Sequence, residues 1–304
     1  MSKKAFLFPG QGSQYIGMAK DLFDNSVEAK EMIKTADDAL GLNLSYIMFN
    51  GPEEQLKQTE FTQPAIFLHS IVLSSIIRTV SPMATAGHSL GEYSALVSAG
   101  AIQFYDAVKL VRARGKAMQQ AGLDNPGTLA AIVGLKPEVV ENLCKEASRE
   151  GIVQCANFNS PGQIVISGSV AGVKKAMELC KANGAKLAKE LVVSGAFHSP
   201  LMQSAKDDLF NVLNETPIYD ARFPVYANVT AKPVMEKDQI KNLLTEQVTS
   251  PVRWEETITN MISDGFDEFY EIGPGKVLQG LIKRINPDVK SFGIDKFEDV
   301  EKYL

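Results

Sequence analysis

The stretch from residue 82 to residue 100 constrains the fold of this chain more than any other segment. It contains a short apolar run typical of a buried strand, then GHSLG at residues 87–91, then a helical stretch that Gly100 ends. A G-x-S-x-G sequence between a strand and a helix is the setting in which this motif presents a nucleophile. The two glycines allow a turn too tight for side chains, so we expect Ser89 at a strained position with its hydroxyl exposed. The helix start would direct free backbone N–H groups at an adjacent oxyanion.

The motif alone is a weak signal. With Gly and Ser each at about 7% of residues, its three fixed positions recur by chance in roughly one 300-residue chain in ten. A nucleophilic serine is therefore a hypothesis that needs partner residues elsewhere in the chain.

Composition indicates a globular protein with a sizeable core. The 304 residues are 45% hydrophobic and 22% charged, which suits one large domain or a large and a small one. The net charge of -5 disfavours nucleic-acid binding, which normally needs a strong basic excess. No segment approaches the length of a membrane span, and the apolar part of the N-terminus is too short for a signal peptide. We expect a cytoplasmic protein that does not contact a membrane.

Cysteine and histidine usage argues against a metal centre. The odd number of cysteines and their lack of metal-site spacing indicate reduced core residues at Cys144, Cys155 and Cys180. The chain also has only 3 histidines, too few for a typical histidine-based metal site.

Several elements precede the motif. A strand at residues 4–8 leads into the loop PGQGSQ at 9–14, which lacks a phosphate-binding pattern. Its backbone either donates an N–H to an oxyanion beside Ser89, cradles a phosphate, or forms a plain turn. A helix is expected over 26–40, with Ser26 as N-cap and Gly41 as its stop. A buried helix over 64–77 carries His69, which we interpret as a hydrogen-bonded core histidine.

Arg114 is the most informative residue of the helix expected over 106–121. It lies within the apolar stripe of this helix, opposite Lys109, Arg112 and Lys116. A lone buried charge costs several kcal/mol, so the guanidinium needs a carboxylate or a phosphate. The partner is either a protein side chain, in an internal salt bridge, or a ligand.

Residues 125–192 change in character and predict a small domain. Strands at 128–133, 152–156, 163–167 and 185–191 alternate with helices at 137–150 and 170–182. The order βαββαβ is ferredoxin-like and can be inserted in a larger unit. The polar segment 157–163 is read as a turn, either a plain one or one wall of a site.

The remainder, residues 1–124 and 193–304, is expected to form the large catalytic domain. Strands near 223–227, 266–271 and 290–294 alternate with helices. This alternation predicts an α/β fold, an α/β-hydrolase-like large domain with a mostly parallel sheet. His198 lies in a loop bounded by Gly and Pro, 109 residues after Ser89, and is a better general-base candidate than His69 or His88.

Seven segments together resemble the malonyl-CoA:acyl carrier protein transacylases, the acyltransferase family of fatty-acid and polyketide synthesis. They occur in order at residues 8–14, 87–93, 114–116, 157–163, 196–198, 247–254 and 271–276. The resemblance extends from near the N-terminus to about residue 284. Seven motifs in a fixed order make coincidence negligible.

The resemblance implies roles for five catalytic residues. Ser89 is the nucleophile that carries the acyl group, and His198 is the base that activates it. The main-chain carbonyl of Gln247 orients the histidine in place of an aspartate. The backbone N–H groups of Gln11 and Leu90 form the oxyanion hole.

Four further positions are implied to bind the substrate. Arg114 clamps the free carboxylate of the malonyl group, which would supply the partner that its buried guanidinium lacks. Phe197, together with Leu90, matches family members that take malonyl rather than methylmalonyl groups. His88 and Asn157 complete the implied substrate-binding set.

The implied reaction is a ping-pong transfer from malonyl-CoA to the phosphopantetheine thiol of acyl carrier protein, without a metal or redox cofactor. Acyl carrier proteins are acidic, so a local basic face is expected on the enzyme. A solvated basic face without any partner remains the alternative. A monomer is the default expectation. The residues proposed for that face are Lys174, Lys175, Lys181, Lys186, Lys189, Lys283 and Arg284.

Other functions fit the residues less well. A serine esterase or thioesterase would use water as acceptor and normally places its acid between the serine and the histidine. The nearest aspartates in that interval, Asp106 and Asp124, do not sit in a strand-end loop of the usual kind. A patatin-like lipase would leave His198 without a role, and an inactive carrier-binding module would not need the reactive residues. A polyketide carrier protein as the acceptor is an open alternative to a fatty-acid carrier.

Overall fold

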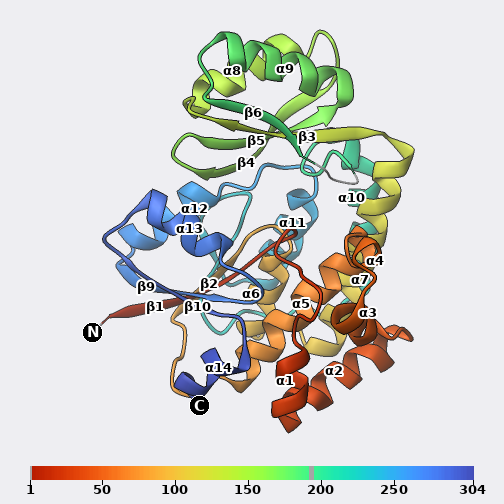
Figure 1. The fold of residues 1–304 in the computed structure, drawn as a ribbon, viewed down its shortest axis with the longest axis vertical. Coiled ribbons are helices and arrows are strands. Elements are labelled where there is room, and N and C mark those ends of the chain that lie inside the picture. Colours follow the sequence, from red (N-terminus) through yellow and green to blue (C-terminus); the bar gives the residue numbers. More distant parts are fainter. Residues whose placement is uncertain (1, 192–194) are drawn as a thin grey trace.

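Two β-sheets organise the chain in the computed structural model, which describes residues 2–191 and 195–304 (Figure 1). The larger unit contains the first part of the chain and its C-terminal part, and the smaller unit lies between them in sequence and at one end of the molecule. The predicted domain boundary at residues 192 and 193 lies outside the described residues.

Sheet A forms the centre of the larger unit. Its strand order is β10-β9-β1-β2-β7-β8, and every pairing is parallel except the one between β7 and β8. The mostly parallel sheet expected from the alternation of strands and helices is thereby confirmed. The strands are β1 (Lys3–Phe8), β2 (Ala84–Gly87), β7 (Val225–Tyr226), β8 (Pro233–Val234), β9 (Phe266–Ile272) and β10 (Lys290–Ile294).

Helices cover both faces of sheet A, and β1 shows why. Its side chains alternate between two cores, with Phe6 and Phe8 in one and Ala5 and Leu7 in the other. A strand buried on both faces appears in the sequence as a continuous apolar run, as residues 5–8 do.

The larger unit contains most of the helices. They are α1 (Lys20–Asn25), α2 (Val27–Leu40), α3 (Leu44–Asn50), α4 (Glu53–Leu56), α5 (Thr59–Ile76), α6 (Gly91–Ser98), α7 (Phe104–Asp124), α10 (Gln203–Glu215), α11 (Lys237–Gln247), α12 (Trp254–Ser263), α13 (Val277–Ile285) and α14 (Phe297–Val300), with the short 3-10 helices η1 (Pro200–Met202) and η2 (Glu301–Tyr303).

The ends of α2 are as the sequence predicts. The Ser26 side chain accepts a hydrogen bond from the N–H of Ala29, so it caps the helix. Gly41 ends the helix with a φ of 56°, a left-handed conformation that glycine adopts without a steric penalty.

The predicted start of the buried helix at residue 64 was wrong, because α5 begins at Thr59. Pro64 therefore lies inside the helix, where it has no N–H to donate to the carbonyl of Glu60. The guanidinium of Arg112, on α7, donates to that carbonyl instead. This donor from a distant part of the chain replaces the missing helical hydrogen bond. The sequence near Pro64 therefore does not reveal that the helix begins before the proline.

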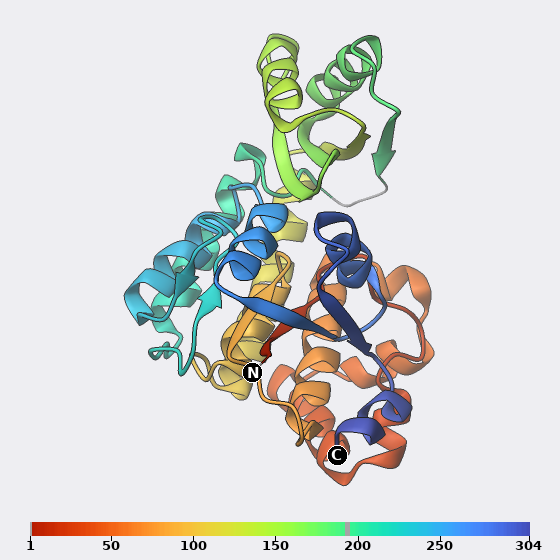
Figure 2. The ribbon, with the colours of Figure 1, turned by 90° about the vertical axis from the view of Figure 1, so that its left-hand side faces the viewer.

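Sheet B organises the smaller unit, and its four strands are antiparallel in the order β4-β5-β3-β6. Both of its helices pack on the face turned away from the larger unit, as Figures 1 and 2 show. This is the ferredoxin-like βαββαβ arrangement predicted from the sequence. The elements are β3 (Gly127–Val133), α8 (Pro137–Ala147), β4 (Val153–Ser160), β5 (Gln163–Ser169), α9 (Val170–Ala182) and β6 (Leu187–Leu191).

The three cysteines lie in the core between sheet B and its helices. Cys144, Cys155 and Cys180 are all buried and free, as expected for reduced core residues. They act as small apolar side chains there.

The reading of residues 157–163 as a turn was also wrong. β4 continues to Ser160, with register shifts near Asn157 and Ser160, and only the two residues before β5 form the turn. The polar end of β4 gains a second partner, because Asn157 forms a parallel bridge with Val252 of the larger unit. The polar composition typical of a turn thus belongs to a strand held between two neighbours.

Gln154 of β4 adds a second connection between the units. Its amide donates to the main-chain carbonyl of His198 at 2.8 Å and to that of Thr249 at 3.2 Å. The segment 249–252 is therefore held by the smaller unit through both backbone and side-chain hydrogen bonds.

The motif glycines lie where backbones meet. A Cβ added to Gly91 would stand 2.1 Å from the carbonyl oxygen of Phe8, and one added to Gly87 would stand 1.9 Å from the main-chain carbon of Gly91. Neither neighbour is a flexible side chain that could move aside. Close approach of β1, β2 and α6 thus requires glycine at both positions.

We expect Gly91→Ala to lower the free energy of unfolding by about 3 kcal/mol, the upper part of the usual range for overpacking, because the clash is with main-chain atoms. The measurement is urea unfolding followed by circular dichroism. Gly280→Ala is the matched control, since Gly280 lies in helix α13 with no atom within 4 Å of an added Cβ. That change should stabilise the protein by about 0.5–1 kcal/mol, and equal effects of the two substitutions would contradict the prediction.

Candidate active site

Ser89 occupies a sharp turn between β2 and α6. Its φ is 51°, a left-handed conformation that is uncommon for a residue with a side chain. Asn228 holds this turn from the loop after β7. Its side-chain oxygen accepts from the N–H of Ser89 at 2.7 Å, and its side-chain nitrogen donates to the carbonyl of Gly87 at 2.7 Å. These two hydrogen bonds stabilise the strained turn that the G-x-S-x-G sequence predicts.

The loop after β1 lies directly against this turn. A Cβ added to Gly10 would stand 2.5 Å from the carbonyl oxygen of His88, so the two backbones are in close contact. Gln11 and Leu90 both line the cavity in front of Ser89. Within residues 2–191 and 195–304, no hydrogen bond occupies the backbone N–H of either residue. Of the three alternatives for this loop, the structure favours the one in which its backbone approaches the serine.

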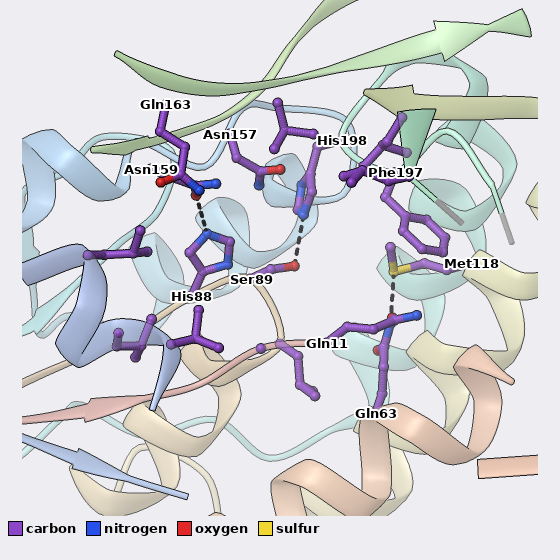
Figure 3. Close-up of a pocket in the computed structure, with 18 of the residues that line it drawn as sticks. Gln11, Gln63, His88, Ser89, Met118, Asn157, Asn159, Gln163, Phe197 and His198 are labelled. Atoms are coloured by element: carbon purple, nitrogen blue, oxygen red, sulfur yellow. Dashed lines mark hydrogen bonds between the residues drawn. The ribbon is translucent and has the colours of Figure 1, made fainter. Parts of the chain in front are cut away.

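His198 contacts the Ser89 hydroxyl from the loop before η1. Its Nε2 lies 2.8 Å from Ser89 Oγ (Figure 3). Its Nδ1 lies 2.9 Å from the main-chain oxygen of Gln247 and 3.1 Å from that of Ser250. Two carbonyl acceptors require the proton on Nδ1, which leaves Nε2 free to accept from the hydroxyl. The His198 side chain is thus oriented by carbonyl oxygens in place of a carboxylate.

Burial keeps the His198 imidazole neutral. Desolvation is the main cause that lowers the pKa of His198 to about 3, and the positive charge of Arg114 lowers it further. The hydrogen bond to the Gln247 carbonyl acts in the opposite direction but is outweighed. A neutral imidazole at physiological pH is ready to accept the hydroxyl proton.

Arg114 points inward from α7 to the same cavity, and only 1% of its surface is exposed. Its two terminal nitrogens donate to neutral groups, with Nη1 2.7 Å from Gln63 Oε1 and Nη2 2.9 Å from Gln247 Oε1. Nη2 also lies 3.2 Å from Ser89 Oγ. No carboxylate within the described ranges forms an ion pair with this guanidinium. The internal salt bridge considered from the sequence is therefore not formed.

The remaining predicted residues lie on the other walls of the cavity. His88, Asn157 and Phe197 all line it, and His88 Nε2 is 2.9 Å from Asn159 Oδ1 (Figure 3). The smaller unit covers the cavity with side chains from all four strands of sheet B, which form its roof, whereas α13 closes one side. The structure thus brings eight of the nine predicted residues to one cavity, and Gln247 reaches it through its contacts with Arg114 and His198.

Four residues of the site were not singled out from the sequence. Gln63 lay just before the expected helix start at residue 64, and Glu92 belonged to the segment 87–93 without any assigned role. Asn159 lay within the segment read as a turn. Asn228 carries no local signal at all, because its partners are far away in the chain.

The basic residues proposed for a docking face lie on both sides of sheet B and on α13 of the larger unit. Lys189 pairs with Ala131 on the sheet face whose other side chains, Leu129 and Leu191, line the cavity. α9, which carries Lys174, Lys175 and Lys181, packs on the opposite face. On the other side of the cavity, the Arg284 guanidinium of α13 donates to the side-chain oxygen of Gln163. Lys189 therefore lies on the cavity side of sheet B and Arg284 contacts a residue that lines the cavity, whereas α9 packs on the face away from it.

The described residues contain neither a metal-binding cluster nor a membrane-spanning helix. Among the described residues, no group of three or more His, Cys, Asp or Glu side chains is placed to hold a metal ion. No helix in that part of the chain is long and apolar enough to cross a membrane.

The chain is similar over almost its whole length to known proteins of one family. Residues 5–292 match the acyl transferase domain family. The chain is 48% identical over 304 residues to a malonyl CoA-acyl carrier protein transacylase of Bacillus subtilis, covering 99% of this chain and 96% of that protein. It is 45% identical over 302 residues to a protein of the same name from Staphylococcus aureus, covering 99% and 98%.

Solved structures with similar names superpose closely on this chain. An acyl carrier protein S-malonyltransferase from Vibrio cholerae superposes with a TM-score of 0.96 at 41% identity, covering 99% of both chains. A malonyl-transacylase in complex with a type II PKS acyl-carrier protein superposes with a TM-score of 0.95 at 40% identity, covering 100% of this chain and 99% of that one.

The lowered pKa of His198 predicts how serine reactivity depends on pH. Because His198 is neutral well below pH 6.5, we expect the burst of Ser89 acylation by p-nitrophenyl acetate to keep a constant rate from pH 8 to pH 5. A histidine with an ordinary pKa would make the reaction about thirtyfold slower at pH 5. Stopped-flow absorbance measures the burst. Ser89→Ala, which should show no burst, is the control, and a loss of rate centred near pH 6.5 would contradict the assignment.

Proposed function

The chain belongs to the acyl transferase domain family, and we propose that it transfers the malonyl group from malonyl-CoA to the phosphopantetheine thiol of acyl carrier protein. The observation that carries this proposal is the convergence of Ser89, His198 and Arg114 on one cavity. A nucleophile activated by a neutral base lies beside a buried cation that lacks an anion. This combination suits an acyl group with a free carboxylate at its far end.

Recognition of that carboxylate depends on the guanidinium of Arg114. A planar fork donates two parallel hydrogen bonds to a carboxylate, which the point charge of a lysine cannot reproduce. Its present direct acceptors, Gln63 and Gln247, are neutral amides, so no carboxylate contacts the guanidinium within the described residues. The 3.2 Å between Arg114 Nη2 and Ser89 Oγ sets a spacing that suits a short dicarboxylic acyl group on the serine.

The first half of the cycle forms a malonyl-serine ester. His198 Nε2 accepts the proton of the Ser89 hydroxyl as the oxygen attacks the thioester carbon. The N–H groups of Gln11 and Leu90 stabilise the negative charge that develops on the carbonyl oxygen. The carbon–sulfur bond then breaks, and the imidazolium returns the proton to the CoA thiolate.

The second half repeats these steps in reverse order. The thiol of the carrier protein gives its proton to His198 and attacks the ester carbon, and Ser89 leaves and regains a proton from the imidazolium. Every step moves a proton or an acyl group, so we propose that no metal or redox cofactor takes part. Water is the competing acceptor, and the roof formed by the four strands of sheet B limits its access.

The acceptor is proposed to dock across the cavity opening between Lys189 and Arg284. An acidic carrier protein would meet positive charge there, although the whole chain has a net charge of -5. The same opening must admit the phosphopantetheine arm, since it leads to Ser89. The lysines of α9 face away from this path.

Two kinds of carrier protein fit this proposal. We propose the fatty-acid carrier as the acceptor. A polyketide carrier is the second candidate, because one solved relative is in complex with a type II PKS acyl-carrier protein. A transfer assay with one purified carrier of each kind distinguishes them.

We expect the wild-type protein to form a covalent malonyl adduct with malonyl-CoA, and Arg114→Ala to lose it. Removing one partner of a buried ion pair costs about 3–5 kcal/mol, which corresponds to about two to three and a half powers of ten in the acylation rate. Acetyl-CoA lacks the carboxylate, so its reaction should be unchanged or faster in the variant. Intact-mass spectrometry of rapidly quenched samples measures both adducts.

Two controls belong to this experiment. Ser89→Ala should give no adduct with either thioester, and an adduct of normal yield would mean that the nucleophile is misassigned. Lys116→Ala, an exposed position two residues along the same helix, should behave as the wild type. Equal loss of malonyl and acetyl transfer in Arg114→Ala would make the arginine structural rather than selective.

Reversing charge at the cavity opening should weaken use of the carrier protein. For Lys189→Glu combined with Arg284→Glu, we expect the KM for the carrier to rise about tenfold, given about 0.5–1 kcal/mol for each exposed charge. Steady-state transfer kinetics at low ionic strength measure this change. Lys174→Glu with Lys175→Glu is the matched control on the far side of sheet B, and an equal rise in KM there would place the docking face elsewhere.

A further inference from the structure

Glu92 is a buried carboxylate behind the reactive residues, and only 2% of its surface is exposed. Its Oε2 accepts from Gln247 Nε2 at 2.7 Å and from the main-chain N–H of Asn228 at 3.1 Å. Neither donor carries a charge. A buried carboxylate without a charged direct partner is unusual, because desolvation of its charge has to be offset by other interactions.

One glutamine side chain connects this carboxylate to Arg114. Gln247 donates to Glu92 through Nε2 and accepts from Arg114 Nη2 through Oε1 at 2.9 Å. Nε2 also donates to the main-chain oxygen of Ser89 at 3.0 Å, which fixes the orientation of the amide. The Gln247 amide therefore lies between the Glu92 carboxylate and the Arg114 guanidinium and is the only group that separates them along this chain of hydrogen bonds. The guanidinium gains electrostatic stabilisation while no carboxylate occupies its fork.

The second donor connects Glu92 to the nucleophile. Asn228, whose N–H is held by Glu92, uses its side chain to fix the N–H of Ser89 and the carbonyl of Gly87. Glu92 thus supports both the strained turn and the substrate-binding cation. It touches neither the reacting atoms nor the space for the substrate, so it is a positioning residue.

We propose that Glu92 is a replaceable counter-charge for Arg114, which takes up one proton from solvent when the carboxylate of the substrate reaches the guanidinium. This inference rests on the proposed function, because it requires a dicarboxylic acyl group. With the cavity empty, ionised Glu92 offsets the charge of Arg114. With a carboxylate bound, two negative charges would face one buried positive charge, and protonation of Glu92 removes the excess. Both hydrogen bonds to Glu92 end on Oε2, which leaves Oε1 to carry the proton.

The surroundings of the carboxyl group favour this exchange. Burial raises the pKa of Glu92 to about 7, and the hydrogen bonds from Gln247 and Asn228 and the charge of Arg114 limit that rise. Arg114, from α7, and the Tyr93 hydroxyl, from α6 itself, are the titratable groups that interact with it. A bound carboxylate neutralises the contribution of Arg114, so the pKa of Glu92 rises further and a proton is taken up. Uptake on binding means that affinity falls as pH increases above about 7.

Calorimetry tests this proposal directly. Ser89→Ala, which keeps malonyl-CoA unreacted, is titrated at pH 8 in buffers of different ionisation enthalpy, and the slope gives the protons taken up. We expect an uptake of at least about half a proton with malonyl-CoA and none with acetyl-CoA, which lacks the carboxylate. Ser89→Ala with Glu92→Gln should show no uptake, because the amide keeps an acceptor oxygen for Gln247 and Asn228 but cannot titrate.

The pH dependence of KM is a second test, because a purely structural role of Glu92 would not change it. The KM of the wild type for malonyl-CoA should rise between pH 7 and pH 9, by up to about tenfold per pH unit, whereas that of Glu92→Gln should stay within about twofold. If Glu92→Gln does not fold, an infrared difference spectrum of Ser89→Ala must show a protonated carboxyl appearing with malonyl-CoA and not with acetyl-CoA.

The outcomes separate the two proposals. Malonyl-CoA binding without proton uptake, or with equal uptake in the Glu92→Gln background, overturns the role of Glu92 and leaves malonyl transfer intact. Failure of the wild type to form a malonyl adduct overturns the proposed function and this inference with it.

Discussion

The hydrogen bonds from Arg114 to two glutamine side chains keep a positive charge inside the site, and the other features of the site depend on that charge. A guanidinium buried to this extent needs acceptors, and amide oxygens accept from its two terminal nitrogens without neutralising its charge. Carboxylates in the same places would make a closed ion pair with little affinity for an external anion. Burial is the main cause of the lowered pKa of His198, and the positive charge of Arg114 lowers it further, so the cation proposed to bind the substrate also helps to keep the base neutral.

Long-range contacts hold this arrangement together. Gln63 comes from α5, Gln247 from the end of α11, and Asn228 from the loop after β7, and all three lie far in sequence from the residues they support. The parallel sheet makes such convergence possible, because β1 and β2 end side by side at the edge where Ser89 lies. Strain at the serine is maintained by close backbone packing on one side and by an asparagine on the other.

The sequence predicts those features that depend on local chemistry. Ser89 is visible because its glycines frame a turn, and Arg114 because a charge interrupts an apolar stripe. The helix start at Thr59 and the strand at 157–160 are not predictable in this way. Each depends on a partner from a distant segment: the Arg112 guanidinium beside Pro64 in one case, and Val252 in the other. The partners of Arg114 could not be chosen from sequence for the same reason.

The contact of Gln154 with the carbonyls of His198 and Thr249 has a consequence for how such enzymes diversify. The orientation of the His198 imidazole depends on the Gln154 side chain of the ferredoxin-like unit. It also depends on residues 247–252 of the larger unit, to which Gln154 donates a hydrogen bond. Natural recombination or an engineered chimaera that exchanged the smaller unit alone would place a foreign β4 strand against residues 247–252. The smaller unit and residues 247–252 are therefore expected to be inherited together, although they lie in separate units of the fold.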